Sequence, residues 1–394
     1  MTRNRPVRFE QMAILVKDRI ENPSEADVER YVGLKHLDPD SLKIRRWGEP
    51  ADVEAAKLLF QPGDIIFGKR RAYQRKLAVA DFRGICSAHA MVLRARSDVV
   101  LPEFLPFFMQ SDGFMNRALE ISEGSLSPTI KWRILAEQKF SLPSMNEQRR
   151  IVGLLRAVEL SIESYASSAM MAETLRTSLC VSLRERNEKS SSSAISSLLV
   201  YSKTGLWGKA QDSADGTSVI VIRSTELDSH GVLDMAGGVT RSISTRNLSD
   251  LQLKRGDLLL EKSGGGPEQP VGRVGFVEEI PSCEHPFICG NFMQLLRPDP
   301  QKVDSNWLFW MMHGLHTSEW TLRHQTQTTG IRNLQVSDYL IELIPVPLLG
   351  VQQEQAREIL SVEAARRDLL DRVDKLNQLK KSILNRNLKN EVPA

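Results

Sequence analysis

The chain has 394 residues, of which 41% are hydrophobic and 26% charged, so it can form two or three folded domains and is not intrinsically disordered. The net charge of +3 is too small to identify a nucleic-acid ligand, so a DNA-binding surface would require local basic clusters or a partner's contribution. Signal-peptide and membrane-span patterns are absent, and the four cysteines follow no disulfide framework, which predicts a soluble, cytoplasmic protein without a membrane partner.

The first half of the chain, residues 1–143, is predicted to be an α/β domain with a mainly β core. Short strand-like runs such as DIIFG, LAVADF and AMVLRA are broken by Gly, Pro, Asn and Asp. A helix is expected over LPEFLPFFMQSDGFMNRAL, and a short strand ending in a proline follows it.

A long helix is predicted next, within residues 144–189. Apolar or small residues recur every seven positions, at Ile151, Val158, Tyr165, Ala172 and Leu179. Sustained heptads favour coiled-coil pairing over packing of the helix on its own domain. The expected length is about 30 residues, or about 45 Å. The serine-rich segment NEKSSSSAISS then predicts a linker and a domain boundary.

The second half repeats this plan, with an α/β domain over residues 190–347 and a helix over residues 348–394. PGDIIFG resembles RGDLLLE, so that Gly63 corresponds to Gly256, and ICSAHAMVLR resembles ICGNFMQLLR. FSLP resembles IPVP, and NEQRRI resembles QEQAREI, which aligns Glu147 with Glu354. The last helix again carries heptads, here at Val362, Leu369, Leu376 and Ile383. Two similar seams in one chain can pair with each other.

The loop after DIIFG is the strongest candidate for DNA contact. Lys and Arg neutralise phosphates, whereas Arg, Gln and Tyr reach the edges of bases. The alternative is a solvated surface loop. The candidate residues are Lys69, Arg70, Arg71, Tyr73, Gln74, Arg75 and Lys76.

Two segments of the second half are weaker candidates. The segment EKSGGGPEQPVGR occupies the equivalent position, and its candidates are Lys262, Ser263, Gln269 and Arg273. The segment HQTQTTGIRN is dense in hydrogen-bonding groups, and its candidates are Gln325, Gln327, Thr328 and Arg332. A plain flexible loop and a capped turn are the respective alternatives.

Catalytic and cofactor motifs are missing from the sequence. It contains no GxxxxGK[ST] loop, and no GxGxxG follows a strand and opens a helix. Cys283, His285 and Cys289 lack the spacing of a zinc site, while Cys86 and Cys289 occupy equivalent repeat positions typical of small core residues. We therefore predict no catalytic, metal-binding or cofactor-binding residues in this chain.

In combination, these segments resemble the specificity subunits of type I restriction–modification enzymes. The resemblance rests on GDIIFGKRRAYQRKLAVADFRGICSAHAMVLR, GDLLLEKSGGGPEQPVGRVGF, GLKHLDPDSLKIRRWG and the two LP…EQRRI-like helix starts. It covers nearly the whole chain, including the doubled plan.

The resemblance implies two target-recognition domains, each reading one part of a split DNA sequence, and two long antiparallel helices that separate them. It implies double-stranded DNA, methyltransferase subunits (expected to be two) and restriction or motor subunits as partners. S-adenosylmethionine, ATP and Mg belong to those partners, so this chain is expected to be non-catalytic. A stand-alone DNA-modifying enzyme and a structural coiled-coil adaptor remain the alternatives.

Overall fold

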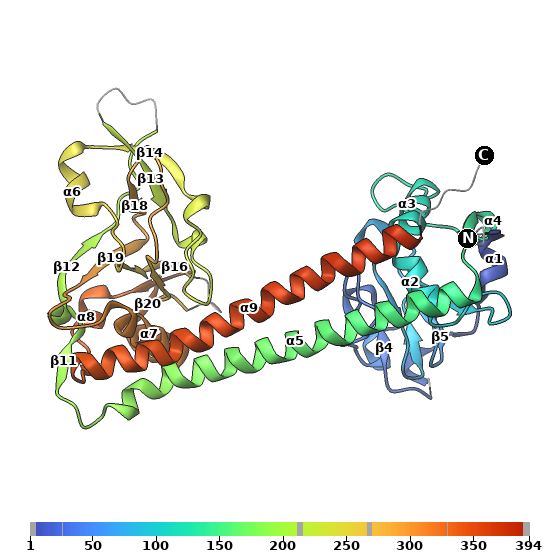
Figure 1. Cartoon of the computed structure of the whole chain (residues 1–394), viewed down its shortest axis with the longest axis horizontal. Coiled ribbons are helices and arrows are strands. Elements are labelled where there is room, and N and C mark those ends of the chain that lie inside the picture. The colour runs from blue at the N-terminus through green and yellow to red at the C-terminus, as the bar shows by residue number, and fades with distance from the viewer. Residues whose placement is uncertain (1–4, 26, 211–215, 266–269, 329, 389–394) are drawn as a thin grey trace. The chain divides into compact units, whose positions relative to one another are not determined.

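The computed structural model describes residues 5–25, 27–210, 216–265, 270–328 and 330–388 (Figure 1). It divides into two compact units. Unit 1 comprises Met1–Ala166 and Leu370–Ala394, and unit 2 comprises Ser167–Leu369. Each of the two longest helices therefore contributes one half to each unit.

Unit 1 is built on two four-stranded sheets and a third, two-stranded one. The sheets have the orders β2–β9–β6–β7, β3–β5–β8–β4 and β1–β10. The strands are β1 (Arg5–Arg8), β2 (Ala13–Val16), β3 (Arg19–Ile20), β4 (Tyr31–Val32), β5 (Lys57–Phe60), β6 (Ile65–Phe67), β7 (Leu77–Val79), β8 (Gly84–Cys86), β9 (Met91–Ala95) and β10 (Lys139–Leu142). The short helices are α1 (Phe9–Met12), α2 (Phe104–Gln110), α3 (Asp112–Glu120) and α4 (Trp132–Glu137).

Unit 2 has one four-stranded sheet, two three-stranded sheets and one two-stranded sheet. Its sheets have the orders β12–β19–β15–β17, β14–β13–β18, β16–β21–β20 and β11–β22. The strands are β11 (Ser192–Ala194), β12 (Leu199–Thr204), β13 (Thr217–Ile222), β14 (Val239–Ile243), β15 (Leu258–Glu261), β16 (Ser263–Gly265), β17 (Val274–Phe276), β18 (Phe287–Cys289), β19 (Met293–Pro298), β20 (Gln325–Thr328), β21 (Ile331–Leu334) and β22 (Leu343–Pro345). The helices are α6 (Leu248–Leu251), α7 (Ser305–Thr317) and α8 (Val336–Leu340).

Matching contacts confirm the internal repeat. The antiparallel sheets β2–β9–β6–β7 and β12–β19–β15–β17 have the same strand order relative to the chain. A buried carboxylate precedes the inner strand of each sheet and pairs at 2.7 Å with an arginine of the neighbouring strand, Asp64 with Arg94 and Asp257 with Arg297. Two such pairs in equivalent places fix the alignment of the copies without reference to sequence similarity.

One alignment within the repeat was wrong. The similarity of NEQRRI to QEQAREI aligns Gln148 with Gln355, but hydrogen bonds place Gln352 in the role of Gln148. Each of these two side chains donates to the carbonyl of the proline five residues earlier, at 2.9 and 2.8 Å. Each also accepts a backbone N–H, from Leu101 at 2.9 Å and from Asp304 at 2.8 Å. Gln352 is therefore the residue equivalent to Gln148, and the alignment of Glu147 and Gln148 with Glu354 and Gln355 is wrong.

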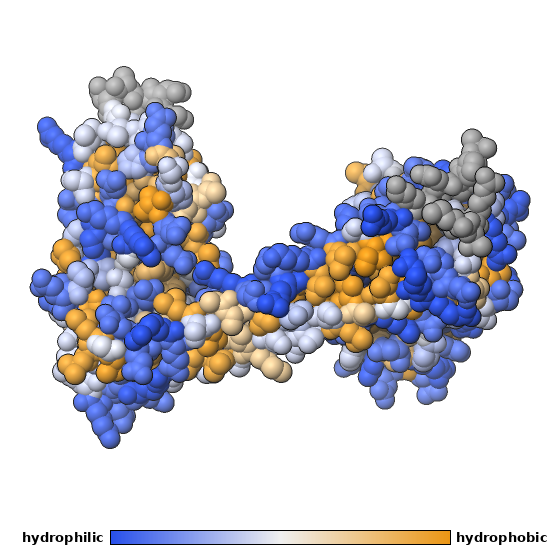
Figure 2. All heavy atoms as spheres, in the orientation of Figure 1, coloured by the Kyte–Doolittle hydropathy of each residue, from blue (hydrophilic) through white to orange (hydrophobic). Residues whose placement is uncertain are grey.

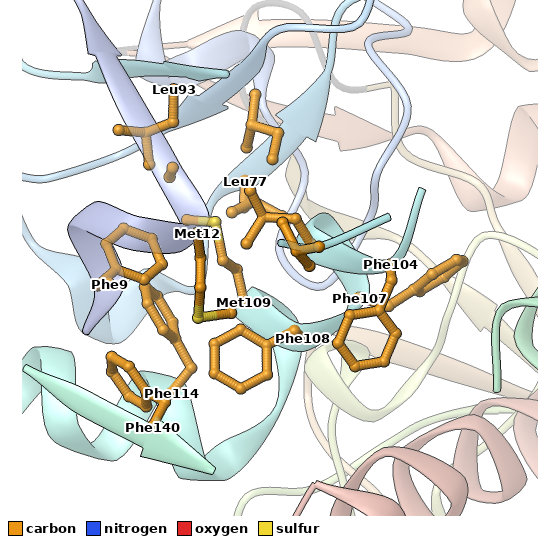
Figure 3. Close-up of a cluster of buried hydrophobic side chains, with 14 of the residues drawn as sticks. Phe9, Met12, Leu77, Leu93, Phe104, Phe107, Phe108, Met109, Phe114 and Phe140 are labelled. Carbon is orange, nitrogen blue, oxygen red and sulfur yellow. The ribbon is translucent and has the colours of Figure 1, made fainter. Parts of the chain in front are cut away.

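Aromatic side chains dominate the core of unit 1 (Figure 3). All seven residues of α2 are buried, because phenylalanines lie on several faces of this short helix. Phe9 and Phe114 approach to 5.3 Å between ring centroids, and Phe108 meets the edge of Phe140 at the same distance. Ile151 of the first long helix joins this cluster, so that helix is anchored in the domain that precedes it.

The two long helices are longer than the predicted 30 residues. Helix α5 (Met145–Arg186) has 42 residues and α9 (Leu349–Asn387) has 39. Within unit 1, Glu159 of α5 pairs with Lys380 of α9 at 2.8 Å, and within unit 2, Arg176 pairs with Glu363 at 3.5 Å. The residue numbers rise in α5 as they fall in α9, so the helices pair in antiparallel directions, as the resemblance implied.

The seam between these helices is more polar than the heptads suggest. In unit 2 the buried side chains include Arg176, Glu363 and Arg366, whereas the heptad residues Val362 and Leu369 are only half-buried. Glu173 also joins this network, 2.6 Å from Arg176.

None of the helices in the described ranges is long and apolar enough to cross a membrane. Hydrophilic residues occupy much of the face of each unit shown in Figure 2.

His313 of α7 predicts a pH dependence of stability. Its side chain is 5% exposed and packs on Phe309 and Trp310, and burial, with the charge of Arg176, lowers its pKa to about 3. In the unfolded chain the imidazole of His313 binds a proton near pH 6.5, whereas in the folded chain it stays neutral down to about pH 3. The free energy of unfolding therefore falls as pH drops from 6.5 toward 3. We expect a loss of about 1 kcal/mol between pH 7 and 5.5. Chemical denaturation at both pH values should show this loss, and His313→Leu should remove it. Equal losses in both proteins would contradict the assignment.

Candidate nucleic-acid interface

The basic loop of unit 1 connects β6 to β7 and has a fixed shape. A single 3-10 turn, Ala72–Gln74, lies between Arg71 and Arg75, which both adopt the left-handed conformation with φ of 56° and 51°. Ala72 is buried and anchors the turn, while Tyr73 is 54% exposed at its outer side. Gln74 is half-buried beside it. The loop thus holds its basic side chains on a short, tightly turned backbone.

Three basic residues at the start of this loop form a positively charged group. Burial lowers the pKa of Lys69, and the charge of Arg19 lowers that pKa further. Burial, with the charges of Arg70 and Lys69, also lowers the pKa of His89, which lies 3.2 Å from Arg70. In the ranges that the structure describes, no carboxylate forms an ion pair with Lys69, Arg70 or Arg71. Basic side chains without carboxylate partners are typical of a surface that binds anions such as phosphates.

The two basic residues at the end of the loop contact the protein itself. Arg75 pairs with Asp40 at 2.6 Å and with Asp112 at 3.1 Å, and it donates to the carbonyl of Gln110 at 2.5 Å. Lys76 donates to the carbonyl of Leu34 at 2.7 Å. The five predicted basic residues therefore divide into three that form no ion pair with a carboxylate in the described ranges and two that hold the loop in place.

This division predicts the behaviour of Arg75→Ala. The variant loses three contacts of a half-buried guanidinium, so we expect the free energy of unfolding to fall by about 1–2 kcal/mol. The salt dependence of DNA binding should stay unchanged, because no phosphate contact is removed. Denaturant titration and binding at several salt concentrations test both parts. A flatter salt dependence in Arg75→Ala would show that Arg75 contacts phosphate.

A hairpin that we did not predict lies against the basic loop. The backbone N–H of Ile130 donates to the carbonyl of Lys69 at 2.9 Å, and that of Arg71 donates to Pro128 at 2.8 Å. The side chain of Arg71 also donates to the hydroxyl of Ser127 at 3.3 Å. Residues 123–129 thereby become part of the same surface. Their sequence, EGSLSPT, has no similarity to the corresponding segment of unit 2 that would have identified it.

In unit 2 the structure joins the two predicted segments into one small sheet. Strand β16 pairs with β21, and β21 pairs with β20. The hydroxyl of Ser263 donates to the side-chain oxygen of Asn333 at 2.6 Å, and the N–H of Leu334 donates to the carbonyl of Lys262 at 2.8 Å. Ser263 and Asn333, 70 positions apart in sequence, therefore share one surface, as the corresponding segments do in unit 1.

The remaining predicted residues of unit 2 differ in their surroundings. Gln327 is exposed on β20, whereas the amide of Gln325 donates to the carbonyl of Val271 at 2.8 Å. Arg332 is half-buried on β21, and Thr328 lies on β20. Gln269 lies outside the described residues.

Arg273 is held within the fold. Its guanidinium is 18% exposed, pairs with buried Glu261 at 2.6 Å and donates to the carbonyls of Leu227 and Ser224. Hydrogen bonding to Glu261 raises the pKa of Arg273, so it stays charged. These contacts make it a support for the loop, in the way that Arg75 supports the loop of unit 1.

Lys262 and Lys69 are equivalent in the two units. Each follows the inner strand of its sheet, and burial lowers the pKa of each. Lys262 donates to the hydroxyl of Thr204 at 3.3 Å.

Cys86 and Cys289 are buried, which confirms their prediction as core residues. Burial raises the pKa of each thiol to about 12. Within the described ranges, no group of three His, Cys, Asp or Glu side chains is arranged to hold a metal ion.

Part of the chain is similar in sequence to proteins of a known family. Residues 52–167 match the family described as the type I restriction modification DNA specificity domain. A curated relative, the EcoDI specificity subunit of a type I restriction enzyme from Escherichia coli, is 28% identical over 155 residues. That match spans 37% of this chain and 32% of the relative, so the chain matches about a third of the curated protein's length.

Two solved structures share the fold over nearly the whole chain. One comes from a study of complex assembly and conformational transition of the type I R-M system, with a TM-score of 0.60, 19% identity and 98% of both chains covered. The other is the S subunit of a type I restriction-modification system from M. genitalium, with a TM-score of 0.57 and 12% identity. It covers 99% of this chain and 98% of that one. These structures confirm the predicted mixed α/β fold with two long helices.

Proposed function

We propose that this chain reads a split DNA sequence, because residues 52–167 match the type I restriction modification DNA specificity domain and the chain shares its fold with the S subunit from M. genitalium. Residues 1–143 would read one part of the target and residues 190–347 the other. The observation that carries this proposal is the pair of equivalent polar surfaces, one on each unit, built from the loop after β6 or β15 and a hairpin from later in the chain.

The chemistry of the two surfaces supports independent reading. In unit 1 the surface contains Lys69, Arg70 and Arg71, which suit phosphates and guanine edges. In unit 2 it contains Lys262 and Gln327 among hydroxyl and amide side chains, which suit base edges more than phosphates. Surfaces on one scaffold that differ in charge and donor pattern favour different base sequences.

The long helices are proposed to bind the methyltransferase subunits. In unit 2, α5 exposes Met170, Met171 and Leu175, which are 70, 69 and 51% exposed. Apolar side chains gathered on one exposed helix typically mark a protein-binding surface. Restriction or motor subunits would join the assembly, and S-adenosylmethionine, ATP and Mg would be bound by the partners. The chain itself is proposed to be non-catalytic.

Methylome sequencing tests this function. Cells that carry the chain and its methyltransferase partner should show a methylated motif in two parts with an unread gap, and cells without the chain should lack it. A stand-alone enzyme would instead methylate or cut DNA when the purified chain is incubated with DNA, metal and S-adenosylmethionine. A purely structural adaptor would show no salt-dependent DNA binding and no effect on the motif.

A further inference from the structure

Each unit presents a hairpin held by the same contact to the loop strand. In unit 1 the N–H of Ile130 donates to Lys69, and in unit 2 the N–H of Leu334 donates to Lys262, at 2.9 and 2.8 Å. Ile130 and Leu334 are 1 and 5% exposed, so each anchors its hairpin in the core. The hairpins are therefore equivalent, although their sequences have diverged.

The free end of each hairpin lies beyond a pair of facing residues. In unit 1 this pair is Glu123 and Thr129, joined by two backbone hydrogen bonds of 2.9 and 3.0 Å. In unit 2 the last pair of the β20–β21 ladder is Thr328 and Ile331. The end of the unit 1 hairpin is residues 124–128, GSLSP.

Each hairpin carries one large aliphatic side chain among polar and small residues, Leu126 at the end of the unit 1 hairpin and Ile331 in the last pair of the β20–β21 ladder. Leu126 is 92% exposed, and Ile331 is 50% exposed. A single exposed apolar residue needs no explanation. Here, however, one recurs in two hairpins that are otherwise different, and each hairpin adjoins the loop that carries Lys69 or Lys262. The recurrence at this place indicates that an apolar contact accompanies the polar ones.

We infer that Leu126 and Ile331 contact the C5-methyl groups of thymines in the DNA major groove. The inference rests on the proposed function and names residues that contribute to its sequence specificity. A two-stranded β-ribbon such as β20–β21 fits the major groove, and thymine is the one unmodified base that presents an apolar group there. Neighbouring side chains of Ser127 and Gln327 supply donors and acceptors for adjacent polar base edges. Leu126 and Ile331 are thus specificity-determining residues for A·T pairs in the two half-sites.

Thymine-to-uracil substitution tests the inference, because it removes only the methyl group. The assay uses the full chain in complex with its methyltransferase partner and duplexes carrying the methylated motif. Uracil at one thymine of each half-site should weaken binding about fourfold, the value of one methyl group returned to water. Leu126→Ala should weaken binding to the thymine duplex by a similar factor, and uracil at that position should then have no further effect. Ile331→Ala should behave likewise for the other half-site.

The controls separate this contact from general effects. Leu126→Met keeps an apolar side chain and should restore the sensitivity to uracil. Ile341→Ala removes an aliphatic residue that is 66% exposed outside the hairpin, and it should leave that sensitivity unchanged. Additive effects of Leu126→Ala and uracil, or a half-site without A·T pairs, would overturn the inference while the split motif still supports the proposed function. Absence of sequence-specific binding by the unmodified complex would instead overturn the proposed function.

Discussion

Replacing Lys69, Arg70 and Arg71 together by alanine is expected to weaken DNA binding roughly 100-fold at physiological salt. Each phosphate contact contributes about 0.9 to the slope of log affinity against log salt, so three contacts contribute about 2.7. The structure supports this set because these three side chains form no ion pairs with carboxylates in the described ranges. Fluorescence anisotropy with the methyltransferase complex, at salt concentrations from 50 to 200 mM, measures both affinity and slope.

A matched triple variant controls for the loss of charge. Arg5, Lys139 and Arg149 are also exposed basic residues of unit 1, but they lie away from the basic loop in sequence. Replacing them by alanine should leave the salt slope nearly unchanged. The assignment of the loop is wrong if both triple variants flatten the slope equally, or if neither does.

Removing one heptad from each long helix is expected to change the gap between the half-sites by about three base pairs. Seven helical residues span about 10 Å, and one base pair rises about 3.4 Å. Helices α5 and α9 both run from one unit into the other without interruption, so their length sets the spacing in this proposal. The variant should lose the original target, with affinity falling about a thousandfold toward the non-specific level.

The contacts between α5 and α9 show which segments of the two helices face each other and should be deleted together. Glu159 faces Lys380, and Tyr165 lies 5.6 Å from the guanidinium of Arg372, which places residues 160–166 opposite residues 372–378. Deleting both segments removes facing residues together and keeps the heptad phase. Deleting only four residues from each helix should break the phase and abolish methylation. An active heptad variant with the original gap would show that the helices do not measure the distance.

The sequence allowed prediction of the features that depend on local pattern. The doubled plan followed from conserved spacing around Gly63 and Gly256, which both adopt positive φ at the turn before the inner strand. The helices followed from their heptads. Their length was underestimated because α5 begins at Met145 and α9 at Leu349, before the first heptad residues Ile151 and Val362.

Features that depend on contacts between distant segments were not predictable. Nothing in the sequence of the loop distinguishes Arg75 from Arg71. Arg75 is distinguished by its contacts with Asp40 and Asp112, which lie 35 and 37 residues away in the chain. The hairpin at residues 123–129 lacks basic residues, so composition gave no reason to place it beside Lys69. Tertiary pairing decides which charged side chains support the loop and which remain available for a ligand.

The most direct test of the account is a chimera in which residues 190–347 come from a related chain with a different target. The methylated motif is read by sequencing DNA from cells that carry the chimera and its methyltransferase partner. Since each unit carries a complete surface of its own, we predict that one half of the motif changes while the other half and the gap remain the same. A chimera that remains active but changes both halves together would show that the two units do not read DNA independently.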